Sequence, residues 1–114
     1  MRGQVQKGKI VLVPFPFTDM TETKIRPALV LHVGNRDVTV AFISSKAPNF
    51  ADEAEVFINA QNPSFVETGL KTTSVIKLDK VTTIDKSLIY GELGEIDDDL
   101  RREINRKFSE IYRL

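Results

Sequence analysis

Arg26 and Pro27 form the dipeptide in this sequence that is best suited to chemistry, because it puts a cation next to an apolar run. A guanidinium group is planar and permanently charged, so it can bind two phosphate oxygens at once. Proline disfavours the α region for the preceding residue, which restricts the backbone of Arg26. The dipeptide also suits the end of a loop, since proline is tolerated at the first position of a strand. The sequence therefore predicts either a held phosphate-binding group or a structural boundary.

The elements that must position Arg26 are short apolar segments separated by Gly, Pro and Asn. This punctuation predicts several short strands and a small β-barrel or sandwich. A chain of 114 residues that is 41% hydrophobic suits a single domain, residues 1–114. The connections at 16–25 and 46–54 are long, and long loops in small domains are often functional. The expected strands cover residues 9–15, 27–33, 38–44, 55–60, 73–79 and 88–93.

Residues 34–37, with the sequence GNRD, separate two β-branched runs and predict an antiparallel hairpin. Glycine and asparagine suit such a turn because they tolerate positive φ. In the second run, the two-residue period puts Phe42 and Ser44 on one face. Ala41 and Ile43 then share the other face.

From Asp97 onward the apolar period becomes that of one helical face. Asp97 to Asp99 supply a cap and negative charges that favour a helix N-terminus. The apolar stripe is expected to pack on the sheet or on a partner subunit, and Glu103 and Lys107 to form a solvated charge pair. The apolar positions of this terminal helix are Leu100, Ile104, Phe108 and Ile111.

The charge of the chain is balanced overall but not along its length. Acidic and basic residues are equal in number, 16 of each, which argues against binding nucleic acid by bulk electrostatics alone. Residues 1–50 nevertheless hold seven Lys or Arg against three Asp or Glu. The basic excess therefore lies in the segment that contains Arg26.

The chain has no cysteine, which excludes disulfides and thiolate metal sites and fits a reducing compartment. The single histidine, His32, lies in an apolar run and is expected to be a packed strand residue rather than a metal ligand. No segment approaches the roughly 18 apolar residues that span a bilayer, and the start lacks a secretory signal. A soluble cytoplasmic protein without a metal or cofactor is expected.

Three segments, GKIVLVPFPFTDMTETKIRPALVL, AFISSKAPN and KTTSVIKLDKVTTIDKSLI, carry a resemblance to a known family. They resemble the MazF/PemK (Kid) toxins of bacterial type II toxin–antitoxin systems. The strongest marks are the Arg-Pro dipeptide before an apolar run and the Thr-Ser-Val-Ile and Thr-Ile-Asp sequences within 73–85. The resemblance extends over nearly the whole chain, from Gly8 into the terminal helix.

The resemblance implies a mainly β fold, a small SH3-like β-barrel of the CcdB/PemK type with a C-terminal amphipathic helix, assembled as a homodimer. It also implies a metal-independent, sequence-specific endoribonuclease that cleaves single-stranded RNA, usually mRNA, and needs no cofactor. The expected protein partner is a cognate antitoxin whose disordered tail lies along the toxin dimer. No association with a membrane is expected.

The resemblance further implies which residues carry the reaction. The arginine before the proline is catalytic in many relatives, and here it is Arg26. Ser44 takes the place of a threonine at the end of the third strand, and Ser45 beside it is an alternative hydroxyl. In the PemK branch a basic residue and an aspartate also act, and these positions are Lys77 and Asp79. Apart from the resemblance, Lys24, Ser45 and Lys46 are expected to contact RNA, the lysines because cations bind the phosphate chain.

In RNA cleavage without a metal, the ribose 2′-hydroxyl attacks the adjacent phosphate, and negative charge gathers on the phosphoryl oxygens. A fixed cation with hydroxyl donors stabilises this charge. Arg26 is assigned to that role, because a guanidinium with a pKa above about 12 is a poor base. Asp79 is the candidate base or the residue that orients Lys77, and a strand-end ion pair is its structural alternative.

A second hypothesis keeps the fold without RNA chemistry. CcdB-type toxins, which act on gyrase, have a similar fold, so architecture alone does not decide the activity. The alternative is a non-catalytic SH3-like binding protein, for example a CcdB-like inhibitor of another protein. A module whose groove receives a disordered peptide is a further possibility.

Overall fold

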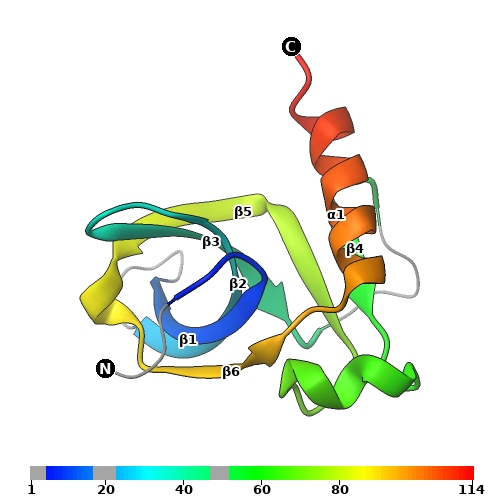
Figure 1. Cartoon of the computed structure of the whole chain (residues 1–114), viewed down its shortest axis with the longest axis horizontal. Coiled ribbons are helices and arrows are strands. Elements are labelled where there is room, and N and C mark those ends of the chain that lie inside the picture. The colour runs from blue at the N-terminus through cyan, green and yellow to red at the C-terminus, as the bar shows by residue number, and fades with distance from the viewer. Residues whose placement is uncertain (1–4, 17–22, 47–51) are drawn as a thin grey trace.

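The structure, a computed structural model, describes residues 5–16, 23–46 and 52–114. Six antiparallel strands form one curled sheet, shaped as a half-barrel, and a helix follows it (Figure 1). The expected mainly β fold with a C-terminal helix is confirmed. The elements are β1 (Lys9–Pro16), β2 (Thr23–Val33), β3 (Asp37–Ser44), β4 (Glu55–Ile58), β5 (Ser74–Asp85), β6 (Gly91–Glu95) and α1 (Asp98–Ile111). Across the sheet the strands run in the order β4-β5-β3-β2-β1-β6.

Several element boundaries differ from the sequence interpretation. β2 begins at Thr23 and not at Pro27, so Arg26 lies inside a strand and not at a loop end. β5 continues well beyond residue 79, to Asp85. Two short 3-10 helices, η1 (Pro63–Thr68) and η2 (Lys86–Leu88), were not expected. Parts of the two long connections, residues 17–22 and 47–51, lie outside the described residues.

Pro27 lies within β2 without removing a ladder hydrogen bond. Leu12 opposes Pro27, and the Leu12 carbonyl accepts a hydrogen bond from the Tyr90 N–H at 2.8 Å, on the side of β6. The Leu12–Pro27 pair is therefore a non-hydrogen-bonded one, in which the nitrogen of Pro27 points away from β1. It points toward β3, whose ladder with β2 stops at the Ala28–Phe42 pair. Pro27 thus occupies the place where β2 and β3 separate, which a residue without an amide hydrogen tolerates.

The expected hairpin joins β2 and β3, and the Gly34 N–H closes it by donating to the Asp37 carbonyl at 2.8 Å. Gly34 does not contribute positive φ to this turn, because it is not among the glycines with positive φ in the described residues. The expectation that His32 is packed was also wrong. His32 is exposed, next to a shift in the β2–β3 register between Val30 and His32.

The sheet buries an apolar cluster on each of its faces. The alternation expected in β3 is confirmed, since Ala41 and Ile43 join one cluster whereas Val38 and Val40 join the other. The larger cluster consists of Ile10, Leu29, Ala41, Ile43, Val56, Ile58, Ile76, Leu78, Ile96 and Ile104. The smaller cluster consists of Val11, Val13, Ala28, Val30, Val38 and Val40.

α1 covers the larger cluster and runs alongside β4 (Figure 1). The side chains that pack there are the expected stripe, with Ile104 buried and Leu100, Phe108 and Ile111 partly buried. The expected solvated pair of Lys107 with Glu103 is wrong. Lys107 Nζ donates to the backbone carbonyl of Glu55 at 2.5 Å, so α1 is tied to the start of β4.

In the part of the chain that the structure describes, no helix has the length and apolar character needed to cross a bilayer.

Candidate active site

Arg26, Ser44 and Lys77 project from the same face of the sheet. Directly opposed residues of antiparallel strands share a face. Phe42 opposes Ala28 on one side and Lys77 on the other, so Lys77 lies on the face of Ala28. Arg26 also lies there, because it is two residues from Ala28 along β2. Continuing the β2–β3 register by two positions puts Ser44 across from Arg26.

We call this surface the Arg26 face and define it by Lys24, Arg26, Ser44 and Lys77, together with Phe15 and Phe42. Lys24 opposes Phe15 across β1 and β2. The rings of Phe15 and Phe42 meet edge to face, with centroids 5.0 Å apart and planes at 63°. The face therefore places cations from β2 and β5 around a hydroxyl group and an aromatic pair. Four of the residues expected from the sequence to bind or cleave RNA lie on it.

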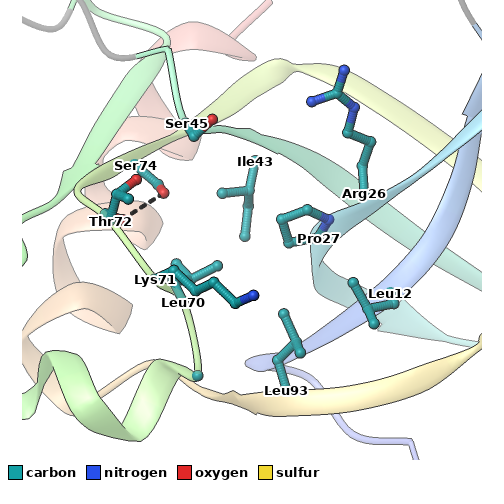
Figure 2. A pocket seen from close by; sticks show the side chains of 11 residues that line it. Leu12, Arg26, Pro27, Ile43, Ser45, Leu70, Lys71, Thr72, Ser74 and Leu93 are labelled. Carbon is teal, nitrogen blue, oxygen red and sulfur yellow. Dashed lines mark hydrogen bonds between the residues drawn. The ribbon is translucent and has the colours of Figure 1, made fainter.

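A cleft of about 470 Å³ opens where β2 separates from β3. Its walls are largely apolar, and polar groups lie at its rim. Figure 2 shows the guanidinium of Arg26 extending away from the ring of Pro27, toward the edge of the cleft where Ser45 lies. Lys71 reaches toward Leu93 from the segment before β5. The lining residues are Leu12, Arg26, Pro27, Ile43, Ser45, Gly69, Leu70, Lys71, Thr72, Ser74 and Leu93.

Arg26 links the cleft with the Arg26 face. Its side chain is half-buried, and its Nε is buried, so the stem is held by the surrounding sheet. Val13 of β1 opposes Arg26, which puts the arginine in a paired part of the strand. A cation held this way is preorganised to stabilise charge that develops on a phosphoryl group.

The two candidate hydroxyls lie on opposite faces of the sheet. Ser44 is half-buried on the Arg26 face, and its Oγ accepts a hydrogen bond from the Lys46 N–H at 3.1 Å. Ser45 is exposed and lines the cleft. Lys46 is exposed beside them. Ser45 lines the cleft together with Arg26, whereas Ser44 shares the Arg26 face with it.

Lys71, Thr72 and Ser74 line the cleft but were absent from the residues assigned to the site from the sequence. Gly69 puts them there, because it follows η1 in the left-handed region with φ +75°. A Cβ at Gly69 would lie 2.1 Å from the carbonyl oxygen of Leu93, so only glycine allows this segment to approach β6. The signal in the sequence was a glycine followed by a polar run, GLKTTS, ahead of an apolar strand.

Lys77 forms its ion pair with Glu55, at 2.7 Å between Nζ and Oε2, and not with the expected partner Asp79. This hydrogen bond is the main cause that lowers the pKa of Glu55 below its ordinary value. Asp79 is exposed and lies in the irregular part of β5, between Lys77 and Val81, where β5 does not pair with β3.

Within the described residues, no group of three or more His, Cys, Asp or Glu is arranged to hold a metal ion.

A half-barrel sheet followed by a helix is also the fold of several solved toxins. The Mycobacterium tuberculosis toxin MazF-mt6 matches with a TM-score of 0.71 at 22% identity, over 93% of this chain and 97% of that one. The MazE–MazF structure from Deinococcus radiodurans matches with a TM-score of 0.70 at 22% identity, over 96% of both chains. An endoribonuclease in complex with its cognate antitoxin, from a mycobacterial species, gives a TM-score of 0.70 at 14% identity, over 94% of this chain and 93% of that one.

The sequence itself decides the family. The model of the PemK-like, MazF-like toxins of type II toxin–antitoxin systems matches residues 6–112. The chain therefore belongs to this toxin family, as its motifs indicated. Comparison with curated proteins gives no match.

Proposed function

We propose that this protein is the toxin of a type II toxin–antitoxin system and acts as a metal-independent, sequence-specific endoribonuclease on single-stranded RNA. Membership of the toxin family supports the assignment. The observation that carries it is that Arg26, Ser44 and Lys77 lie on one face of the sheet, and that Arg26 also lines a cleft. Cations and a hydroxyl so placed match the charge that forms during phosphoryl transfer.

In the proposed reaction the 2′-oxygen forms a bond to the adjacent phosphorus and the bond from phosphorus to the 5′-oxygen breaks. The products are a 2′,3′-cyclic phosphate and a 5′-hydroxyl, with the 2′ proton passing to a base and a proton reaching the leaving oxygen. Arg26 stabilises the phosphoryl oxygens, and Ser44 or Ser45 donates a further hydrogen bond. Lys77 adds a second cation, and Asp79 is the candidate base.

Single-stranded RNA suits this chemistry better than a duplex. An A-form duplex presents its base edges in a deep, narrow groove that side chains cannot read. Lys24 on the Arg26 face and Lys46 after β3 are exposed cations that would bind the phosphate chain. Ser45 would contact the RNA from the cleft.

The proposed partners follow from the family. Solved relatives have been crystallised with antitoxins, which supports a cognate antitoxin for this chain. A homodimer and a cytoplasmic location remain predictions from the resemblance. The exposed side chains of Ile25 and Tyr90, at 41% and 67%, are compatible with a homodimer.

One observation favours a second function, binding without cleavage. Five of the cleft residues, Leu12, Pro27, Ile43, Leu70 and Leu93, are apolar. Such walls suit an apolar anchor of a peptide better than a phosphate chain. The same fold could then serve as a binding protein whose arginine is structural.

An RNA cleavage assay with EDTA separates the two functions. We expect the purified protein to cut single-stranded RNA and to leave cyclic phosphate ends. Arg26→Ala should lower kcat by about 10²-fold or more while the protein stays folded, because a preorganised charge donor is lost. Arg36→Ala, in the exposed turn between β2 and β3, is the matched control and should cleave normally. Full activity in the Arg26 variant, or no activity in the parent protein, would reject the proposed endoribonuclease.

A further inference from the structure

Glu55 is the residue that holds the ammonium group of Lys77. It is the first residue of β4 and directly opposes Lys77 of β5. The Glu55 side chain is 10% exposed and the Lys77 side chain 25%, and Oε2 and Nζ are 2.7 Å apart. Sequence reasoning did not assign Glu55 to the site, since 22 residues separate it from Lys77.

Glu55 and the residue before it are held by three elements. Its Oε1 accepts the backbone N–H of Asp52 at 3.3 Å, which closes the turn before β4. Its backbone carbonyl accepts Lys107 Nζ of α1 at 2.5 Å, and the Leu78 N–H donates to the carbonyl of Ala54 at 2.8 Å. The carboxylate therefore stands on a rigid support made of the turn, β5 and α1.

The stability of the fold does not by itself explain the ion pair between Glu55 and Lys77. Removing charges from water costs free energy, so a largely buried pair contributes little to folding compared with apolar residues of similar size. What Glu55 does provide is order, because a free lysine side chain has many rotamers. An ammonium group has three donors, and one bond to Glu55 leaves two for another acceptor.

We infer that Glu55 is a positioning residue for RNA cleavage: it holds the Lys77 ammonium on the Arg26 face so that the remaining Lys77 hydrogens meet the phosphate opposite Arg26. This inference rests on the proposed endoribonuclease. It replaces Asp79 as the residue that orients Lys77 and leaves the role of base to Asp79.

The inference predicts a split between kcat and KM. In Glu55→Gln the pair loses its negative charge, so attraction of the RNA phosphates is unchanged or stronger and KM does not rise. Lys77 is no longer held, so kcat falls at least tenfold. A purely structural defect would instead lower the fraction of folded protein. The molecules that remain folded would then have the kcat and the KM of the parent protein.

The experiment measures kcat and KM on a single-stranded RNA for the parent protein, Glu55→Gln, Lys77→Met and the double variant. Glu53→Gln is the matched control, because it makes the same change at an exposed residue two positions earlier, and it should behave as the parent. If Glu55 acts through Lys77, Glu55→Gln should have no further effect on kcat once Lys77 is Met. Circular dichroism reports the folded fraction of each variant. Should Glu55→Gln fail to fold, Glu55→Asp, which keeps the charge on a shorter stem, takes its place with the same expected fall in kcat.

Two results would overturn the inference while the proposed function stands. One is a parent-like kcat in Glu55→Gln, and the other is a full additional loss when Glu55→Gln is combined with Lys77→Met. Absence of cleavage by the parent protein would overturn the proposed function and, with it, this role for Glu55. The outcomes therefore separate failure of the inference from failure of the function.

Discussion

Two adjacent serines offer a hydroxyl near Arg26, and the sheet sends them in opposite directions. Ser44 lies on the Arg26 face with Lys77, whereas Ser45 lines the cleft. The transition state develops charge at one place, so only the hydroxyl on that side can donate to it. The side that Lys77 shares is the better candidate, because two cations and one hydroxyl lie on that face of the sheet.

We therefore expect Ser44→Ala to lower kcat for RNA cleavage by about 10²-fold, the usual effect of removing one donor to a developing oxyanion. Ser45→Ala should mainly raise KM, because Ser45 would contact the RNA from the cleft. Steady-state kinetics on one RNA substrate tests both. Ser109→Ala, on the exposed side of α1, is the control. A larger fall in kcat for Ser45→Ala than for Ser44→Ala would place the reaction on the cleft side instead.

The resemblance to the toxin family put forward Arg26, Ser44 and Lys77 as candidates from the sequence, and the strand register then puts them on one face of the sheet. Glu55 was not identified, since its pairing with Lys77 depends on how β4 and β5 meet in space. Lys71 was not assigned to the site either, because its place in the cleft depends on the left-handed Gly69. Contacts between distant segments were therefore the part of the site that the sequence did not reveal.

At the scale of elements, α1 is fixed both in its second half and at its N-terminal cap. Lys107 ties its second half to β4, and Asp97 caps its first turn. Asp97 accepts two hydrogen bonds, from the Ser64 hydroxyl at 2.6 Å and from the Leu100 N–H at 2.8 Å. These bonds, that of Ser64 first, hold the pKa of Asp97 below its ordinary value. The cap thus joins η1 to α1 through one carboxylate.

This cap predicts a pH dependence of stability. The pKa of Asp97 is lower in the folded than in the unfolded state, so its contribution is complete above the unfolded pKa of about 3.9 and is lost as the pH falls through the folded pKa. Asp97→Ala should cost about 1 kcal/mol at pH 7, as for other N-cap residues. The difference from the parent protein should shrink below about pH 4.

Urea denaturation at pH 7 and pH 3 measures both effects. Asp98→Ala is the control, since Asp98 lies in the same first turn with its side chain 87% exposed. A loss for Asp97→Ala that stays the same at the two pH values would show that the charge of the cap does not contribute.

Most of the strands and the C-terminal helix could be predicted from the sequence, since strands and helices differ in the spacing of their apolar residues. The exceptions were set by neighbours. β2 starts before Pro27 because β1 pairs with it from Thr23 onward. β5 is long because β3 pairs with both parts of it, on either side of an irregular stretch.

At the scale of the whole molecule, zero net charge conceals an uneven distribution. Lys24, Arg26 and Lys77 share one face of the sheet. Glu92 and Glu95 lie on the edge strand β6, and each forms an ion pair with Lys9 of β1 at 3.1 Å. These hydrogen bonds, that of Glu92 first, raise the pKa of Lys9 above its ordinary value. RNA should therefore approach from the side of β2 and β3 and avoid β6.

A local cationic surface predicts a shallow dependence of RNA affinity on salt. Each phosphate contact to single-stranded nucleic acid contributes about −0.7 to the slope of log K against log salt. Lys24→Ala should therefore make the slope shallower by about 0.7 and weaken binding to all sequences alike. Titration with an RNA whose reactive 2′-hydroxyl is replaced by hydrogen measures this from low to physiological salt. Arg102→Ala on α1 is the control, and an unchanged slope for Lys24→Ala would exclude a phosphate contact at Lys24.

The irregular stretch of β5 bears on how the chain tolerates changes of length. Phe42 opposes Lys77 and Ala41 opposes Val81, so the three residues 78–80 have no partners in β3. Leu78 is buried, but Lys80 is exposed. A peptide tag inserted after Lys80 would interrupt no pair between β3 and β5, because these pairs stop at Lys77 and resume at Val81. The fold should therefore accept a reporter at this position, but the reporter would stand beside Asp79, the candidate base.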